Sequence, residues 1–331
     1  MKYFVTGATG FLGKQVARQL VAAGHSVVAL ARNPAKAADL AALGVTLAQG
    51  DITDQASLRA PMQGVDGVFH IAGWYKIGAR DTREGQTINV DGTRHVLEVM
   101  RELGIPKGVY TSSLVVWSDT HGRLVDESYR YTGPHLSEYD RSKAAAHELA
   151  ESFIRDGLPL VILQPGVIYG PGDTSVLHDA LVQYLTGKLF IIPSDTAHSL
   201  AYVDDVARAH LLAMDKGKIG ENYIIGGPPT KLTEFFAMAE AITGIKVTRL
   251  RAAPGFMRAL AGLTSLIEKV APMPTEYSSE YLRENAGITY IGDNSKARRV
   301  LGYEPRPLRA GLEVTLKAEM ELLKRKAKPN T

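Results

Sequence analysis

The sequence predicts an α/β protein with a doubly wound parallel sheet and a smaller C-terminal substrate-binding subdomain. Two observations carry this prediction. Short apolar, β-branched runs alternate with amphipathic segments through the first half of the chain, and a glycine-rich turn joins the first run to the first amphipathic segment. The chain has 331 residues, of which 45% are apolar, so it can bury a substantial core.

The alternation can be followed element by element. Strand-like runs occur at 2–7, 26–31, 45–50, 66–72, 107–113 and 158–165. The helix-like segments between them are 11–24, 34–44, 54–62, 92–104 and 144–157. Gly24, Gly44 and Gly104 each follow an apolar helical stripe, where a helix end favours a left-handed residue. Strands and helices at this spacing predict parallel strands joined by right-handed crossovers.

The rhythm changes after residue 165. Longer pieces interrupted by proline and glycine follow, and one more sheet-like run appears at 221–227. We therefore expect a main domain built from 1–165 plus 201–227. The expected substrate-binding subdomain is built from 166–200 plus 228–331 and is threaded back onto the main sheet.

Composition excludes several classes of protein. The 38 basic residues nearly balance the 35 acidic ones, and the excess positive charge lies in the tail 322–331, so we expect no nucleic-acid partner. The chain has no cysteine, which excludes disulfides, thiolate zinc sites and thiol nucleophiles, and its histidines show no metal-ligand spacing. We expect no metal, no membrane span and a cytoplasmic location, because no apolar stretch has the length of a span and no charged leader precedes the first strand.

The stretch VTGATGFLG places Gly7, Gly10 and Gly13 between the first strand and the first helix. A tight turn, a close approach of the backbone to a pyrophosphate, and close helix packing each exclude a Cβ atom. The alternative is an ordinary tight turn, but the position in the first strand–helix–strand unit favours a Rossmann dinucleotide site. We expect the rest of the turn to contact the same cofactor, through Thr9, Phe11 and Leu12.

The end of the second strand indicates which dinucleotide binds. An enzyme that prefers NAD usually has an acidic residue there for the ribose hydroxyls, whereas this chain has Ala31 and Arg32. A guanidinium suits the extra phosphate of NADP, and Lys36 could add charge, so we expect NADP(H) to be favoured over NAD(H). The alternative for Arg32 is a solvated loop side chain. Asp51 and Ile52 are expected near the adenine, although Asp51 could equally be a helix cap.

A tyrosine and a lysine lie four residues apart in two places, YDRSK and YLTGK. Tyr139 and Lys143 begin a run of strong helix formers and would share one face, where the ammonium can favour the phenolate of an acid–base tyrosine. Lys143 could also bind the nicotinamide ribose. In the second pair, Gly187 indicates a helix end that turns Lys188 away from Tyr184. We therefore interpret the spacing of the second pair as a coincidence without a catalytic role.

A further residue is needed to hold the substrate oxygen. The fifth expected strand ends with Ser112 and Ser113 at the carboxyl edge of the sheet, where open α/β folds bind their ligands. Serine at a strand end is commonly a turn former. Beside Tyr139 and Lys143 the functional interpretation is favoured, with Ser113 ahead of Ser112.

Together these residues resemble the extended short-chain dehydrogenase/reductases of the NAD(P)-dependent epimerase/dehydratase superfamily. The motifs span nearly the whole chain: TGATGFLG, FHIAG, NVDGT at 89–93, TSS, YDRSK, PGVIYGPG, and YVDDVARAH at 202–210. The resemblance implies that Ser113 and Tyr139 bind the reacting oxygen, that Tyr139 exchanges the proton, and that Lys143 holds the ribose and tunes the tyrosine. It further implies that the nicotinamide end of the cofactor is surrounded by His70, Ala72, Pro165 and Val167.

Two branches of that superfamily compete. Nucleotide-sugar epimerases and dehydratases typically have an asparagine before the YGP-like turn and often an arginine before the YVDD-like motif, where this chain has Val167 and His198. With Ala31 and Arg32, these departures resemble the dihydroflavonol 4-reductase and 3β-hydroxysteroid dehydrogenase branch. We therefore expect an NADP(H)-dependent oxidoreductase that interconverts a carbonyl and a secondary alcohol on a fairly apolar small molecule. The alternatives are an NAD-dependent nucleotide-sugar epimerase or dehydratase and a non-catalytic NADP sensor.

The expected substrate walls are 72–81, 181–187 and 254–270. Trp74, Tyr75 and Tyr169 are the expected substrate contacts, because they offer large apolar surfaces. The helix from Pro254 is more simply explained by packing its apolar stripe into the subdomain core. A homodimer through the helices beginning near Asn89 and Tyr139 is common in the family, and a monomer stays equally open.

Overall fold

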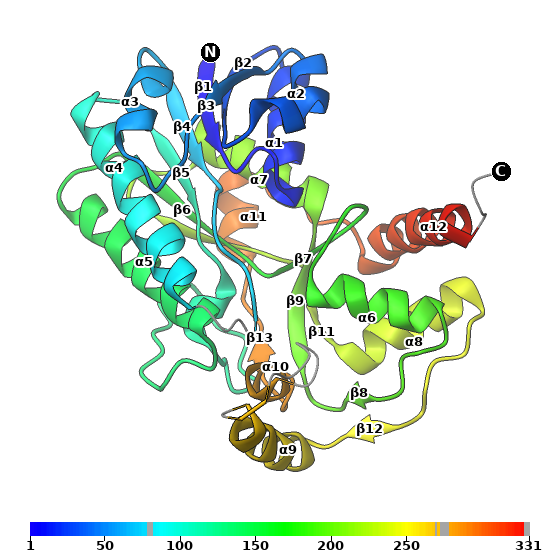
Figure 1. Cartoon of the computed structure of the whole chain (residues 1–331). Helices are drawn as coiled ribbons and strands as arrows, with labels where there is room; N and C mark the ends of the chain where they lie inside the picture. The colour runs from blue at the N-terminus through cyan, green and yellow to red at the C-terminus, as the bar shows by residue number, and fades with distance from the viewer. Residues whose placement is uncertain (78–81, 269, 272–277, 328–331) are drawn as a thin grey trace.

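A seven-stranded parallel sheet forms the centre of the molecule in the computed structural model, which describes all residues except 78–81, 269, 272–277 and 328–331 (Figure 1). The strand order is β10-β6-β5-β4-β1-β2-β3. The strands are β1 (Lys2–Thr6), β2 (Ser26–Ala31), β3 (Thr46–Gln49), β4 (Gly67–His70), β5 (Gly108–Thr111), β6 (Leu160–Pro165) and β10 (Asn222–Ile225). The predicted doubly wound α/β fold is confirmed.

Helices cover both faces of this sheet, as the alternation of side chains along β1 requires. Tyr3 and Val5 point into a core shared with α1 (Phe11–Ala22) and α7 (Val203–Lys216), whereas Phe4 points into a core shared with the helices of the opposite face. That opposite face carries α3 (Ala56–Met62), α4 (Gly92–Glu102) and α5 (Glu138–Arg155). The continuous burial of β4, β5 and β6 is typical of a parallel sheet covered on both faces.

The strand order reverses between β1 and β4. The connection from β1 leads through α1 to β2 on one side, while β4 and β5 continue on the other side. Crevices at the carboxyl ends of strands at such a switch point are the usual ligand sites of open α/β sheets. The glycine turn follows β1 and the segment from Ile71 follows β4, so both lie at this position.

The second part of the molecule contains two small sheets. In one, β11 (Pro229–Lys231), β9 (Ala197–Tyr202) and β13 (Thr289–Tyr290) lie side by side and β7 (Val167–Tyr169) also pairs with β9, while the other joins β8 (Ile192–Pro193) to β12 (Arg251–Ala252). The helices here are α6 (Val176–Leu185), α8 (Leu232–Thr243), α9 (Pro254–Ile267), α10 (Ser279–Glu284) and α12 (Leu308–Ala327).

The chain crosses between the two parts differently from the expected division. β10 joins the main sheet beside β6, in line with the assignment of 201–227. The expected boundary after residue 200 falls inside β9. In addition, α11 (Ser295–Leu301) belongs to the expected C-terminal segment but packs against α7 and β10, because its buried Ala297 and Leu301 complete that side of the main core.

Local signals located most helix ends. Gly24, Gly44 and Gly104 have φ of 79°, 88° and 61°, the left-handed conformation expected of them. The segment expected to be helical at 34–44 is split into a 3-10 turn at Pro34–Ala37 and a short α2 (Ala38–Ala42). A π-helical turn at Gly85–Asp91, which sequence periodicity did not predict, leads into α4. Within the described residues, no helix is both long and apolar enough to cross a membrane.

Candidate active site

The turn after β1 is shaped by close contacts that glycine alone permits. Gly7 has a φ of 73°, and a Cβ atom there would lie 2.6 Å from the backbone nitrogen of Ala72 at the end of β4. A Cβ atom on Gly13 would collide with the carbonyl group of Gly7. These two glycines therefore press the first turn of α1 against the strand ends. Gly10 begins the helix as its N-cap residue, with its amide bonded to the Gly7 carbonyl at 2.9 Å.

The N-terminus of α1 suits a bound anion. No side chain caps it, and Gly10, Phe11, Leu12 and Gly13 all line the cavity beside it. Uncapped amides at a helix N-terminus carry a partial positive charge and donate hydrogen bonds to phosphate groups. The residues of this turn therefore fit the pyrophosphate of a dinucleotide.

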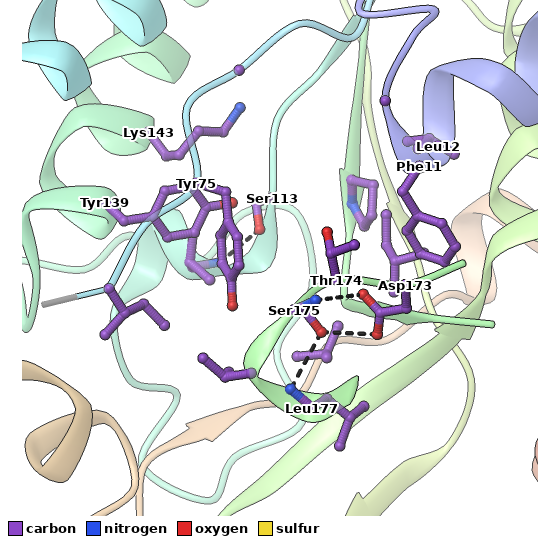
Figure 2. Close-up of a pocket in the computed structure, with 18 of the residues that line it drawn as sticks. Phe11, Leu12, Tyr75, Ser113, Tyr139, Lys143, Asp173, Thr174, Ser175 and Leu177 are labelled. Atoms are coloured by element: carbon purple, nitrogen blue, oxygen red, sulfur yellow. Dashed lines mark hydrogen bonds between the residues drawn. The ribbon is translucent and has the colours of Figure 1, made fainter. Parts of the chain in front are cut away.

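One continuous cavity of about 680 Å³ runs from this turn across the sheet edge into the second part of the molecule. Figure 2 shows Lys143, Tyr139, Ser113 and Tyr75 on one side and Phe11, Leu12 and the segment from Asp173 to Leu177 on the other. Nearly all the side chains expected at the site line it: Gly7, Thr9, Gly10, Phe11, Leu12, Gly13, Arg32, Asp51, Ile52, Ala72, Trp74, Tyr75, Ser113, Tyr139, Lys143, Pro165 and Val167. Lys36, His70 and Tyr169 are not among the lining residues.

His70 is a correction to the expected cofactor contacts. Its ring lies beneath the cavity floor and is 1% exposed, with Nδ1 2.8 Å from the Thr6 hydroxyl and Nε2 3.0 Å from the Thr93 hydroxyl. The Thr6 hydroxyl oxygen accepts hydrogen bonds from the amides of Ile71 and Ala72. The Thr6 hydroxyl proton is therefore donated to Nδ1 of His70, whose imidazole is neutral. Burial lowers the pKa of His70 to about 3. His70 therefore positions the backbone after β4 and does not face the cavity.

Tyr169 is a correction to the expected substrate contacts. It is 1% exposed, its ring packs edge-on against Tyr202, and its hydroxyl donates to the carbonyl of Leu308. The pairing of β7 with β9 turns this side chain into the main core, while Val167 and Ile168 of the same strand line the cavity. The ring packs edge-on against Phe235 as well as Tyr202, a placement that the motif alone does not reveal.

The cavity end near β2 and β3 holds the residues expected around the adenosine. Arg32 is exposed and lines the cavity just beyond β2, whereas Lys36 is exposed on the following 3-10 turn and lies outside the lining. Asp51 also lines the cavity, but its Oδ1 already accepts from the amide and the hydroxyl of Thr53, both at 2.9 Å. Asp51 thus closes a local turn and is not the helix cap suggested as its alternative role, because the N-cap residue of α3 is Gln55.

The first two turns of α5 present Tyr139 and Lys143 to the cavity. Ser137 caps this helix, and its hydroxyl accepts from the Asp140 amide at 3.2 Å. Lys143 donates to the carbonyl of Thr111 at the end of β5 at 2.9 Å and is 6% exposed, and this burial lowers its pKa to about 8. Burial also raises the pKa of Tyr139 well above its usual value, and the neighbouring Asp140 raises it further.

The two serines at the end of β5 have different surroundings. Ser112 is 3% exposed, and its hydroxyl lies 2.9 Å from Nδ1 of His147 on α5. The Ser113 hydroxyl interacts instead with the Tyr139 phenol, an interaction that lowers the pKa of the tyrosine. Ser113 is therefore the serine beside Tyr139, as Figure 2 shows.

The second tyrosine–lysine pair lies far from this chemistry. The Tyr184 hydroxyl is held in the core by Thr243 at 2.6 Å and by the Ile245 carbonyl at 2.7 Å. Gly187 has a φ of 71° and ends the helix, so Lys188 is exposed. Neither residue lines the cavity.

Asn89 supports the site, although sequence reasoning gave it no role beyond its motif. It is 2% exposed, accepts from the amide of Trp74 at 2.7 Å, and donates to the Trp74 carbonyl at 3.1 Å and to Ser142 at 2.9 Å. It thus ties the segment after β4 to α5. The signal available was the polar Asn89 at the start of the NVDGT motif.

An acidic cluster beside Tyr139 was also missed. Asp140 is fully buried and accepts from Ser137 at 3.1 Å and from the Tyr290 hydroxyl at 3.3 Å. Glu284, from the end of α10, lies near it, and burial raises the pKa of both carboxyl groups. No sequence signal joined Asp140 to Glu284, because the two residues come together only when α10 folds back on α5.

The cavity wall opposite α5 is built by the turn before α6. Asp173 accepts from the amide and the hydroxyl of Ser175, both at 2.8 Å, and the Ser175 hydroxyl in turn caps the helix through the amide of Leu177 (Figure 2). The expected wall at 72–81 is described only to residue 77, and its remaining positions 78–81 lie outside the described residues. Within it, Trp74 is 4% exposed, and its indole donates to Glu84 at 2.9 Å.

The helix α9 was the third expected wall. It buries Met257, Ala261 and Thr264 against α10 and contributes no residue to the cavity lining. The interpretation that α9 packs into the core of the subdomain therefore applies.

Known proteins share this architecture. Residues 3–226 match the NAD dependent epimerase/dehydratase family. The chain is 31% identical to sterol demethylase protein B of Methylococcus capsulatus, over 94% of this chain and 95% of that protein. It is 33% identical to a putative dihydroflavonol 4-reductase of Synechocystis, over 73% of each. The crystal structure of gox2253 superposes with a TM-score of 0.84 at 29% identity, over 97% of this chain and 98% of that one.

The glycine turn, the uncapped helix and the tyrosine–lysine pair at one sheet edge define a nicotinamide-dinucleotide-binding oxidoreductase. The family match over residues 3–226 makes the assignment more specific. This chain belongs to the NAD dependent epimerase/dehydratase family and is an NAD(P)-dependent enzyme of the extended short-chain dehydrogenase/reductase type. Its curated relatives include reductases of the dihydroflavonol reductase-like branch, as the resemblance implied.

Proposed function

We propose that this oxidoreductase uses NADP(H) to interconvert a carbonyl and a secondary alcohol on a fairly apolar small molecule. The observation that carries the proposal is the character of the cavity beyond the expected nicotinamide position. Among the described lining residues, Arg32 and Lys143 are the only arginine and lysine side chains, and we assign both to the cofactor. The diphosphate of a nucleotide-sugar substrate would therefore find no cation of its own on these walls.

Apolar surface supports the same substrate class. The lining in the second part of the molecule is dominated by Val176, Leu177, Ala180, Leu189, Ile191, Ile192, Leu232 and Phe236. Such a surface gains free energy by removing apolar area of a ligand from water. The names of the two relatives refer to a sterol and a dihydroflavonol, which are ring compounds without phosphate groups.

We assign the cofactor to the described residues as follows. The amides at the start of α1 would hold the pyrophosphate, and Arg32 would pair with the 2′-phosphate of NADP. Ala72, Pro165 and Val167 would surround the nicotinamide end, which the His70 network positions from below. When bound, the nicotinamide supplies a hydride to the reacting carbon in reduction and takes one up in oxidation.

The protein contributes acid–base chemistry and charge stabilisation. In the reductive direction, Tyr139 gives its phenolic proton to the carbonyl oxygen while Ser113 donates a hydrogen bond to the same oxygen. Both interactions strengthen as negative charge grows on that oxygen, so they stabilise the transition state more than the ground state. Lys143 carries a positive charge close to Tyr139 and stabilises the phenolate that remains. Its bond to the Thr111 carbonyl keeps the ammonium in place.

The test begins with the nucleotide that the purified protein carries. We expect denatured protein to release NADP(H), or the native protein to take up NADPH reversibly, and NADPH oxidation to follow when apolar ketones are added. Tightly held NAD(H), together with turnover of nucleotide sugars, would establish an epimerase or dehydratase instead. Reversible NADPH binding without turnover of any ketone, aldehyde or alcohol would indicate the non-catalytic sensor.

A further inference from the structure

Glu284 presents a buried carboxyl oxygen to which none of the residues that the structure describes is hydrogen-bonded. The residue closes the short helix α10, is 8% exposed, and lines the cavity with its neighbours Tyr281 and Asn285. Its Oε1 atom is buried and has no hydrogen-bond partner among the described residues. A buried acceptor without a hydrogen bond lowers the stability of the folded protein unless a ligand or an ordered water donates to it. The unpaired oxygen of Glu284 therefore indicates a place where a ligand donor could bind.

The Ser137 hydroxyl interacts with the Glu284 carboxyl group and lowers its pKa, but Ser137 also donates to Asp140, and Oε1 of Glu284 stays without a partner among the described residues. Asp140 also accepts from Tyr290, and as a second carboxyl group it disfavours a charge on Glu284. The negative charge of Glu280, on the same helix, raises the pKa of Glu284, and the positive charge of Arg283 lowers it. The position is therefore costly for a carboxyl group that serves structure alone.

Glu284 also belongs to the chamber in which the carbonyl is expected to react. Its charge acts on both Tyr139 and Tyr75, whose rings meet edge-on in the cavity. A ligand whose carbonyl reaches Tyr139 would therefore extend within range of Glu284. Most of the remaining lining of this chamber is apolar, and its other polar side chains include Asn285 and His198, whose Nδ1 is also without a partner among the described residues.

We propose that Glu284 is a specificity-determining residue that accepts a hydrogen bond from a hydroxyl group of the substrate, remote from the reacting carbonyl. The inference rests on the proposed function and narrows its substrate class from apolar ketones to hydroxylated apolar ketones. A site built to bond a hydroxyl discriminates strongly against an analogue that lacks it, because the buried acceptor then stays unpaired. The apolar walls supply affinity, and Glu284 selects the orientation.

The experiment compares trans-2-decalone with its monohydroxylated derivatives as substrates for NADPH oxidation. For the wild-type protein, we expect one hydroxylated regioisomer to exceed the parent ketone by about tenfold or more in kcat/KM. In Glu284→Leu, kcat/KM for that regioisomer should fall at least about tenfold more than for the parent, mainly through KM. Glu127→Gln is the matched control, since Glu127 is a half-buried carboxyl with a raised pKa that lies outside the cavity. It should keep the wild-type preference.

Each outcome bears on the proposal. A wild-type preference that survives in Glu284→Leu would overturn it, and so would equal rates for the parent and every regioisomer. If Glu284→Leu does not fold, the wild-type series still decides, because a ratio near one for all regioisomers removes the need for a hydroxyl acceptor. Failure of the proposed function looks different: the wild-type protein would then oxidise NADPH with none of the ketones.

Discussion

The ring of Tyr75 stands edge-on to the ring of Tyr139, with centroids 4.9 Å apart and planes at 89°. Tyr75 comes from the segment after β4 and Tyr139 from α5, so the contact joins two elements that line the same side of the cavity (Figure 2). The Tyr75 hydroxyl also interacts with the backbone amide of Val176 at the start of α6. Tyr75 therefore stands between the acid–base tyrosine and the apolar wall.

Replacing Tyr75 should weaken substrate binding. Each Å² of apolar surface removed from water contributes about 25 cal/mol, so losing the ring surface that a bound apolar ketone would cover should let Tyr75→Ala raise KM by about three- to tenfold. Tyr75→Phe keeps the ring contact and should change KM by less than about threefold. Steady-state kinetics at saturating NADPH measures both. Equal KM values for Tyr75→Ala and the wild-type protein would show that Tyr75 does not contact the substrate.

Replacing the phenol of Tyr139 should separate chemistry from binding. General acid–base catalysis contributes about 10²–10⁴-fold, so Tyr139→Phe should lower kcat by that factor. The Kd of NADPH, followed by fluorescence titration, should stay within about twofold, because the glycine turn and Arg32 are unchanged. Turnover close to the wild-type rate would remove Tyr139 from the catalytic assignment.

Cofactor preference should depend on the residues at the end of β2. The double substitution Ala31→Asp and Arg32→Ala supplies an acceptor for the ribose hydroxyls and removes the cation for the 2′-phosphate. The ratio of kcat/KM with NADPH to that with NADH should fall by about tenfold or more, since one charge-assisted hydrogen bond contributes about 1.5–3 kcal/mol. Lys36→Ala is the matched control, because Lys36 lies outside the cavity lining, and it should shift the ratio by less than about threefold. An unchanged ratio in the double variant would remove Arg32 from the cofactor assignment.

The pH dependence of ketone reduction should report Lys143. Its pKa is lowered to about 8 by burial, so the side chain is cationic below that pH and neutral above it. Because the cation stabilises the phenolate formed from Tyr139, kcat/KM for reduction should be highest below pH 8 and fall as the pH rises through that value. Lys188→Ala should leave this profile unchanged, since Lys188 is exposed and is not among the residues that line the cavity. A profile flat to pH 10 would contradict the role given to Lys143.

The buried Tyr169 should affect stability and not turnover. Tyr169→Phe removes the hydrogen bond to the Leu308 carbonyl and should lower the free energy of unfolding by about 0.5–1.5 kcal/mol. Denaturant titration measures that loss, and kcat and KM for any ketone should stay within about twofold of wild type. A large rise in KM without a loss of stability would restore Tyr169 as a substrate contact.

The amino-acid sequence by itself determined the fold class, the glycine turn and the choice between the two tyrosine–lysine pairs. These features follow from local signals: strand and helix periodicities, glycines at helix ends, and a pair of side chains one turn apart on a helix. Gly7 and Gly187 illustrate this, because each adopts the positive φ that its local sequence indicated. The position of Ser113 at the end of the fifth expected strand placed it in the same group, and family resemblance added its expected role.

The tertiary structure alone decided which side chains face the cavity. Packing against Tyr202 and Phe235 holds Tyr169 in the core beside the cavity-lining Ile168, and hydrogen bonds to Thr6 and Thr93 hold His70 buried at the end of β4, although motif positions suggested contact for both. The meeting of Asp140 with Glu284 needs α10 to return across α5, a contact between segments far apart in the chain. Side-chain direction and long-range packing depend on the assembled core, which explains why the sequence predicted where the site lies but not every residue that lines it.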